Sequence, residues 1–320
     1  MSIKVSVAMT SYNGEKYIIE QLESIRTQTR APDEVIILDD RSSDNTVALV
    51  KKFILDNNLT NWRVIVNKVN LGWKKNFFES VRQTTGDIVF FSDQDDIWLP
   101  DKIRKMSEAM VEKHMGALYG AKEIVDGEGT AHPERMERAS FTNNIIQVPF
   151  NESFYAIKTL GCCMCASREI VDAYIKLGFY EGGHDSQCGR LALLLSSLWY
   201  LDEPVIRYRI HGNNSSGIAA DISFGASSLD KRKTSVHNSV LWLQLLLQEL
   251  DLSQGKREIL QNCCSAVSKR DQYLNGEISF LTLLKHRKYY TGATMLIGDF
   301  AYRHNLNSTL GKIRWNFRRG

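Results

Sequence analysis

The first hundred residues alternate between short apolar runs and segments with helical spacing of apolar residues, and this alternation sets the class of fold. The four apolar runs VSVAM, EVIILDD, WRVIVNK and DIVFF begin at positions 5, 34, 62 and 87. Segments 13–29, 42–57 and 76–85 lie between them and place apolar residues on one helical face. Strand and helix signals at this spacing predict an α/β fold with a mainly parallel central sheet covered by helices on both faces.

Each predicted strand ends in a polar cluster. These clusters are residues 10–13 after the first strand, Asp39 and Asp40 after the second, Asn70 and Gly72 after the third, and Asp93, Asp95 and Asp96 after the fourth. Ligands of open parallel sheets bind in the crevice beyond the carboxyl ends of the strands. We therefore expect the four clusters to meet on one rim of the sheet.

The fourth cluster lies in FFSDQDDIWLP at 90–100 and places three carboxylates within four positions. Such charges repel one another unless a cation, backbone donors or solvent compensate them. In isolation the stretch would be a solvated turn, with Asp96 or Asp101 capping the next helix. Here the acids follow a strand of a ligand-binding sheet, beside a second acidic pair. The pattern therefore favours a Mg²⁺ or Mn²⁺ site that also binds a diphosphate.

Composition excludes several classes of protein. The chain has 320 residues, of which 43% are hydrophobic and 24% charged, as is typical of a soluble globular protein. The formal net charge of +3 gives no general argument for nucleic acid, which is not an expected partner. The N-terminus enters a strand pattern directly, without the layout of a secretory signal, and no apolar run approaches the roughly 20 residues of a membrane span. We expect a cytoplasmic protein.

The six cysteines contain no CxxC pair and have no histidines at zinc-finger spacing. They are Cys162, Cys163, Cys165, Cys188, Cys263 and Cys264. In a reducing compartment they are expected to be small buried apolar residues. The alternative is a metal cluster formed by the CCxC segment with Cys188.

The second hundred residues are less regular. Helices are predicted at 102–113 and 167–178, and a strand is predicted at 203–211, ending in GNNSSG. Residues 120–160 are poorly periodic and are expected to be loops, as in GEGTAHPER and VPFNES. After about residue 222 the pattern becomes helical and basic.

Six segments together resemble one known family. They are VSVAMTSYNGEKYIIEQLESI, ILDDRSSDNT, NLGWKKNF, GDIVFFSDQDDIWLPDKI, GHDSQCGRLALLLSSLWYLDEP and YRIHGNNSSG. In this order they are similar to family 2 inverting glycosyltransferases of the GT-A fold, which is Rossmann-like. The similarity is greatest to bacterial rhamnosyltransferase-like enzymes of surface polysaccharide assembly, and it covers residues 3–217. It implies a GT-A domain at 1–222, with a nucleotide-binding half at 1–100 and an acceptor half at 101–222, followed by a helical region at 223–320.

The resemblance implies a donor site on the predicted rim. Thr10 and Tyr12 match positions that line the base and ribose, and Asp40, with or without Asp39, matches the acid that hydrogen-bonds the base. Lys74 or Lys75 is expected to meet the diphosphate. The implied donor-binding residues are Thr10, Tyr12, Asn13, Asp39, Asp40, Asn70, Gly72, Lys75, Asn76 and Asp93.

The resemblance also implies a metal and a catalytic base. Asp93 and Asp95 match the DxD motif that binds Mn²⁺ or Mg²⁺, with Asp95 as the direct ligand and Asp93 nearer the ribose or the metal shell. His211 matches a histidine near the metal or diphosphate. Asp185 of the His184-Asp185 pair matches the base that takes a proton from the acceptor hydroxyl.

The acceptor side departs from the family pattern. Trp98 and His184 are expected on that side. Ser186, Gln187 and Cys188 stand where relatives commonly have aromatic residues, which points to an unusual acceptor.

The implied reaction moves rhamnose from dTDP-rhamnose to a hydroxyl of a glycan or lipid-linked glycan in bacterial surface polysaccharide synthesis. A UDP-hexose is the second candidate donor. The competing hypothesis is an inactive subunit that binds a nucleotide sugar or glycan in an assembly complex. The acid at Asp185 together with the DxD motif favours catalysis. A receiver-type domain would leave the His-Asp pair unexplained, and a nucleotidyltransferase would show a Gly-rich basic loop near its N-terminus.

Residues 280–320 carry eight Lys or Arg residues and one acid, Asp299, with aromatic residues between them. Such a surface is typical of contact with anionic lipid, where each basic residue contributes on the order of 1 kcal/mol. We therefore expect a peripheral position at the inner face of the cytoplasmic membrane. The alternatives are a solvated helical face, the contact of a homo-oligomer, or RNA binding.

Overall fold

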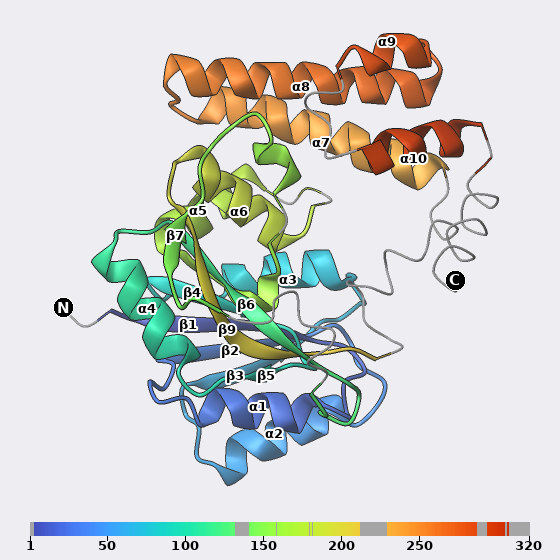
Figure 1. Cartoon of the computed structure of the whole chain (residues 1–320). Coiled ribbons are helices and arrows are strands. Elements are labelled where there is room, and N and C mark those ends of the chain that lie inside the picture. The colour runs from blue at the N-terminus through green and yellow to red at the C-terminus, as the bar shows by residue number, and fades with distance from the viewer. Residues whose placement is uncertain are drawn as a thin grey trace. The chain divides into compact units, whose positions relative to one another are not determined.

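The computed structural model describes residues 3–131, 141–157, 159–178, 180, 182–211, 229–286, 293–304 and 306. The chain divides into two compact units (Figure 1). The sheet unit comprises residues 1–149, 158–179 and 183–211, and the helical unit comprises 150–157, 180–182 and 212–320. The predicted domain boundary after residue 222 lies outside the described residues, as do the GNNSSG segment and six of the eight basic residues of 280–320.

The sheet unit is built on a nine-stranded sheet, as counted over the described residues, in the order β3-β2-β1-β4-β8-β6-β9-β5, with β7 also pairing with β9. Strands β1 to β4 pair in parallel, β8 runs antiparallel between β4 and β6, and β6 pairs in parallel with β9. Strands β5 and β7 are antiparallel to β9. The strands are β1 (Val5–Ser11), β2 (Glu34–Asp39), β3 (Trp62–Val66), β4 (Ile88–Ser92), β5 (Ile97–Trp98), β6 (Ala117–Val125), β7 (Ile145–Gln147), β8 (Met164–Ser167) and β9 (Leu198–Arg209).

Helices cover both faces of this sheet because its inner strands are apolar on both sides. Every residue of β1, β2 and β4 is buried. Figure 1 shows α1 (Ile18–Arg26) and α2 (Thr46–Asp56) on one face, and α3 (Trp73–Arg82), α5 (Arg168–Leu177) and α6 (His184–Leu194) on the other. Apolar residues of α1, α2 and α4 (Lys102–Glu112) share one core cluster with alternate residues of β1 and β2. The predicted α/β class with a mainly parallel sheet is confirmed.

The expectation of loops throughout 120–160 is wrong, because β6 extends to Val125 and β7 spans Ile145–Gln147. The β6 segment ALYGAKEIV has no regular alternation of apolar and polar residues. In the structure, two register shifts interrupt its pairing with β9 around Ala121. Gly120 permits this pairing, because a Cβ there would lie 2.6 Å from a methyl of Val205. Tertiary pairing on both edges therefore makes β6 a strand despite its weak pattern.

The helical unit contains α7 (Leu229–Glu249), α8 (Gln254–Asn275), α9 (Phe280–Leu284) and α10 (Ala293–Arg303). The long helices α7 and α8 contribute buried side chains to this unit, among them Trp242, Leu243 and Leu260. Helix α8 ends at Gly276, whose φ of 89° is the left-handed conformation that favours glycine. None of the helices in the described part of the chain is long and apolar enough to cross a membrane.

Candidate active site

The rim beyond β1, β2 and β4 is held together by hydrogen bonds between the loops that leave these strands. The backbone N–H of Asn13 donates to Ser42 Oγ at 2.9 Å, and Asn13 Oδ1 accepts from the N–H of Ser43 at 2.8 Å. Asn13 has a φ of 46°, a left-handed conformation that asparagine tolerates better than most residues. Asn13 thus joins the first two polar clusters, as their positions in the sequence predict.

Asp39 and Asp40 form hydrogen bonds with different loops. Asp39 is fully buried and accepts hydrogen bonds from Ser11 Oγ at 2.7 Å, Ser42 Oγ at 2.6 Å and the N–H of Ser42 at 2.7 Å. Asp40 Oδ1 accepts from Asn67 Nδ2 at 2.9 Å and from the N–H of Leu71 at 2.7 Å. Asp39 therefore fixes the loop after β2, whereas Asp40 fixes the loop after β3.

The loop before α3 closes around the Asp40 carboxylate. The N–H of Gly72 donates to Asp40 Oδ2 at 2.8 Å, and Gly72 adopts a φ of 78° at the helix N-cap. Asn70 Nδ2 donates to the Asp40 carbonyl at 3.1 Å, and buried Asn76 donates to the Leu38 carbonyl at 2.9 Å. The predicted donor residues Asp40, Asn70, Gly72 and Asn76 thus form one network at the end of β2.

The rim also carries exposed residues. Tyr12 is 49% exposed and Lys75 is exposed, whereas Thr10, near the end of β1, is buried. Gln94, the middle residue of the DxD motif, accepts from the N–H of Tyr12 at 2.8 Å and donates to its carbonyl at 3.0 Å. This paired contact ties the acidic turn to the loop after β1. It requires Gly14, because a Cβ there would lie 2.2 Å from Gln94 Oε1.

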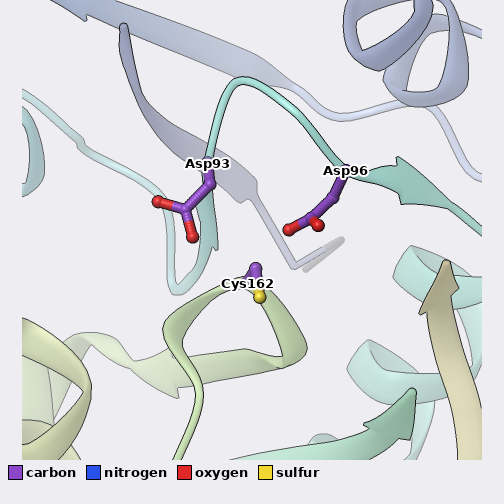
Figure 2. Close-up of side chains that lie close together, drawn as sticks. All are labelled: Asp93, Asp96 and Cys162. Carbon is purple, nitrogen blue, oxygen red and sulfur yellow. The ribbon is translucent and has the colours of Figure 1, made fainter. Parts of the chain in front are cut away.

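Two of the three acids lie together with a cysteine. Figure 2 shows Asp93 and Asp96 on the turn between β4 and β5, with Cys162 on the neighbouring 3-10 segment, and one ligand atom from each lies within 4.8 Å of the others. Burial, followed by the negative charges of neighbouring acids, raises the pKa of Asp93 well above its usual range. Burial and the charge of Asp95 raise the pKa of Asp96 to about 7. In the described part of the chain, buried Asp96 Oδ2 has no hydrogen-bond partner.

Asp95 lies against His211. Asp95 Oδ2 is 2.8 Å from His211 Nε2, and both side chains are mostly buried. The His211 ring also packs against Tyr17, with ring centroids 4.8 Å apart. The structure thus brings together the predicted pair of Asp95 and His211, which are separated by 116 positions in the chain.

These acids meet the requirements of a divalent cation. Neighbouring like charges with raised pKa values, one partly buried at Asp93 and one buried at Asp96, and an unpaired Asp96 Oδ2, are features that a bound cation would relieve. Asp93, Asp95 and Asp96 supply the oxygen ligands that Mn²⁺ and Mg²⁺ prefer. A cluster of the CCxC segment with Cys188 is not found among the described residues; of these cysteines, Cys162 alone belongs to a possible metal group.

Asp185 lies in the first turn of α6. Its negative charge contributes to the raised pKa of Asp93, so the two carboxylates share one electrostatic environment. Thr159 Oγ1 donates to the Asp185 carbonyl at 2.9 Å, and the N–H of Ser186 donates to Asp185 Oδ1 at 2.7 Å. Gly183 precedes the pair, and a Cβ there would lie 2.4 Å from Asp185 Oδ1.

Two predicted acceptor-side residues lie in the interior instead. His184 is 4% exposed, stacks on Phe77 with ring centroids 3.8 Å apart and meets Phe91 edge-on. Trp98 is 2% exposed and packs against Phe90. Both side chains are enclosed by core residues of the sheet unit, and their place on the acceptor side stays a prediction.

Sequence reasoning missed Arg209, the last residue of β9. Its guanidinium is buried and donates to the Asp95 carbonyl at 2.9 Å and the Gly127 carbonyl at 3.0 Å, and it forms an ion pair with Glu20. Its backbone N–H donates to Asp96 Oδ1 at 3.1 Å. The sequence feature that could have indicated this role is an arginine at the end of a buried strand, two positions before His211.

Lys102 was also missed. It is 2% exposed, its ammonium lies 3.7 Å from the centre of the Trp98 ring, and it donates to the Cys162 carbonyl. Burial lowers the pKa of Lys102 to about 8, while the charge of nearby Asp96 acts in the opposite direction. A lysine at the start of a polar helix gives no sequence signal of such burial.

Comparisons with solved structures identify the fold. S. aureus TarS, solved in complex with UDP-GlcNAc, matches with a TM-score of 0.61 and 17% identity over 99% of this chain and 92% of that chain. The mannosyltransferase PcManGT of Pyrobaculum calidifontis, solved with GDP-Man and Mn²⁺, matches with a TM-score of 0.55 and 17% identity over 96% and 87%. At this level of identity the matches show the fold, which is GT-A.

Sequence comparisons identify the family. The dTDP-rhamnosyl transferase RfbG of Shigella flexneri is 30% identical over 230 residues, which cover 68% of this chain and 76% of that protein. The model of "Glycosyl transferase family 2" matches residues 6–174, more than half of the chain. The acidic turn and the strand ends that build the rim lie inside that match. The chain therefore belongs to glycosyl transferase family 2 and is a glycosyl transfer enzyme.

Proposed function

We propose that this protein transfers a sugar, with inversion, from a nucleotide-diphosphate donor to a hydroxyl of a glycan or lipid-linked glycan in bacterial surface polysaccharide synthesis. The observation that carries the proposal is the acidic turn at the rim where a parallel sheet binds its ligands, with the negative charge of Asp185 acting on Asp93 in that turn. dTDP-rhamnose is the first candidate donor, because RfbG is named a dTDP-rhamnosyl transferase. UDP-hexose is the second, since TarS was solved with UDP-GlcNAc.

The donor is proposed to bind across the ends of β1, β2 and β4. Exposed Tyr12 offers an aromatic face to the base, and the Asp40 network shapes the pocket with Thr10, Asn13 and Asp39 around it. Exposed Lys75 offers a cation to the diphosphate. In this arrangement Asp39 acts through Ser42, because its own carboxylate is fully buried.

Asp93, Asp95 and Asp96 are proposed to hold one Mn²⁺ or Mg²⁺, with His211 completing the site. When bound, a divalent ion stabilises the negative charge that develops on the leaving diphosphate. The protein's own part is to hold the acids in place. Gln94 does so through Tyr12, and Arg209 does so through the Asp95 carbonyl.

Asp185 is proposed as the catalytic base. As the acceptor oxygen attacks the anomeric carbon, the carboxylate of Asp185 takes the hydroxyl proton and the bond to the diphosphate oxygen breaks. The acceptor oxygen enters on the face opposite the leaving group, which inverts the configuration. The first turn of α6 holds this carboxylate in place through the Ser186 N–H.

The experiment measures transfer and slow hydrolysis with a panel of nucleotide sugars, with Mn²⁺, with Mg²⁺ and with a chelator. We expect metal-dependent turnover of one donor, and a loss of at least about 100-fold in Asp185→Asn, in line with the contribution of a general base. Asp172→Asn on α5 is the matched control, because Asp172 is exposed and pairs with Arg168. Near wild-type turnover in Asp185→Asn would reject the base assignment.

We also propose that residues 280–320 contact the inner face of the cytoplasmic membrane. Four large apolar side chains in this segment are exposed: Leu281 at 74%, Ile297 at 50%, Phe300 at 36% and Leu306 at 42%. Asp299, the one acid of residues 280–320, is fully buried and is already paired with two arginines of α7 and α8. Apolar side chains among basic residues are the combination that binds anionic lipid.

Sedimentation with vesicles of phosphatidylglycerol and phosphatidylcholine tests this contact. Leu281→Glu is expected to reduce the bound fraction severalfold, whereas Leu55→Glu on α2, at a site 76% exposed, is expected to leave it unchanged. Equal loss in the two variants, or no binding by the wild type, would count against the membrane contact. A concentration-dependent mass in the absence of vesicles would favour a homo-oligomer instead.

A further inference from the structure

The cysteine beside the acidic turn changes which metals the site can bind. Cys162 lies on the 3-10 segment Gly161–Cys163, and its Sγ lies within 4.8 Å of carboxylate oxygens of both Asp93 and Asp96 (Figure 2). Buried Lys102 donates to the Cys162 carbonyl and so holds this segment in place. The thiol is therefore a built part of the cluster.

An independent feature of the cluster points to a ligand. Asp96 is 1% exposed, and its Oδ2 has no hydrogen-bond partner in the described part of the chain. A buried carboxylate oxygen without a strong donor costs free energy unless a proton or a cation satisfies it. The side chain that faces this carboxylate is the Cys162 thiol, which is a weak donor. This oxygen belongs to the same group of three residues as the thiol.

The donor atoms differ from those of a site built for Mg²⁺ or Mn²⁺ alone. Those two ions prefer oxygen, whereas thiolate sulfur selects softer ions such as Zn²⁺. Zinc binds cysteine, histidine and carboxylate, and three protein ligands leave its fourth position open. Two carboxylates and one thiolate are such a set of three.

We propose that Asp93, Asp96 and Cys162 form a binding site for a thiophilic divalent cation, Zn²⁺ physiologically and Cd²⁺ as its probe. On binding, the Cys162 thiol releases its proton to solvent and the sulfur bonds to the ion. The occupied site withholds Asp93 and Asp96 from the Mn²⁺ or Mg²⁺ of the proposed function, so Zn²⁺ inhibits transfer. The binding itself does not rest on the proposed function, whereas the inhibition does.

The test of binding titrates the full chain with Cd²⁺ and follows the ultraviolet charge-transfer band of a cadmium–thiolate bond. The wild type is expected to gain the band, and Cys162→Ser is expected to lose most of it and to bind Cd²⁺ at least about tenfold more weakly. Cys163→Ser is the matched control, since Cys163 is an adjacent cysteine buried to the same extent. It is expected to keep the band.

An unchanged band in Cys162→Ser, or no band in the wild type, would overturn the site. Cys162→Ala, checked by circular dichroism, provides a second variant if the serine does not fold. In the activity assay, Zn²⁺ added to Mn²⁺-supported transfer is expected to inhibit wild type and Cys163→Ser but not Cys162→Ser. A cadmium band with no transfer from any donor would reject the proposed function alone, and transfer that Zn²⁺ leaves unchanged would reject the inhibition.

Discussion

His184 predicts a specific loss of stability in acid. Its ring is 4% exposed between Phe77 and Phe91, and neither ring nitrogen has a hydrogen-bond partner in the described part of the chain. A Cβ on Gly161 would lie 2.2 Å from His184 Nε2, so there is no room for a water molecule on that side. Burial lowers the pKa of His184 to about 4, and the charge of Asp185 only partly opposes it.

The size of the effect follows from the two pKa values. The unfolded chain binds a proton at His184 near pH 6.5, whereas the folded chain binds it near pH 4. Between these values the unfolded state holds more protons, so the free energy of unfolding falls as pH falls. From pH 7 to pH 5 the loss assigned to His184 is about 2 kcal/mol.

The assay is urea unfolding followed by circular dichroism at pH 7, 6 and 5, for wild type and for His184→Leu. Asp93 and Asp96 have raised pKa values and act in the opposite direction, because a raised folded pKa adds stability at low pH that is lost as pH rises. The difference between wild type and variant cancels these common terms. We expect the unfolding free energy of the wild type to fall by about 2 kcal/mol more than that of the variant.

The control is His114→Asn, at an exposed position with a φ of 50° that asparagine tolerates. It is expected to keep the wild-type pH dependence. If wild type and His184→Leu lose the same free energy between pH 7 and pH 5, then His184 titrates normally in the folded state. The burial argument would then be refuted, whatever the absolute stability of the variant.

Two further substitutions test buried ion pairs. The lysine of Arg209→Lys cannot reach Glu20 and the Asp95 and Gly127 carbonyls together. The variant is expected to lose about 2 kcal/mol of unfolding free energy in urea and to bind Mn²⁺ roughly tenfold more weakly by calorimetry. Wild-type Mn²⁺ affinity in this variant would show that Arg209 does not position the acidic turn. Asp299→Asn removes the buried negative charge that faces two arginines of the helical unit. It is expected to cost about 3 kcal/mol by the same urea assay, and a loss below about 1 kcal/mol would contradict the ion-pair argument.

The outline of the sheet was predictable because strand signals are local. Strands β1 to β4 are rich in apolar residues, and the polar residues after them could be placed on one rim from the direction of parallel strands alone. Strand β6 was not predictable from its own residues. Its conformation depends on β8 and β9, which pair with it from positions more than 40 residues further along the chain.

The residues of the site could be named from the sequence, but their partners could not. Asp39 and Asp40 are adjacent in the chain, yet strand geometry directs successive side chains to opposite faces, and so they hold different loops. His184 and Asp185 diverge in the same way, because neighbours on a helix lie about 100° apart. One enters the core and the other stays near the acids. Adjacent letters in a motif therefore need not share a role.

The acidic turn gives the strongest case. Its three carboxylates look equivalent in the sequence, but in the structure they have different neighbours. His211 contacts Asp95, the backbone N–H of Arg209 donates to Asp96, and Cys162 lies near both Asp93 and Asp96. Each partner comes from a segment at least 60 positions away. For this reason neither spacing nor composition could show which acids bind an ion that prefers oxygen and which bind an ion together with the Cys162 thiol. The division depends on β9 and the Gly161–Cys163 segment approaching the turn from different elements. If Cys162→Ser loses the cadmium band while Mn²⁺ still supports transfer, then one turn serves two kinds of metal because of what the fold places beside it.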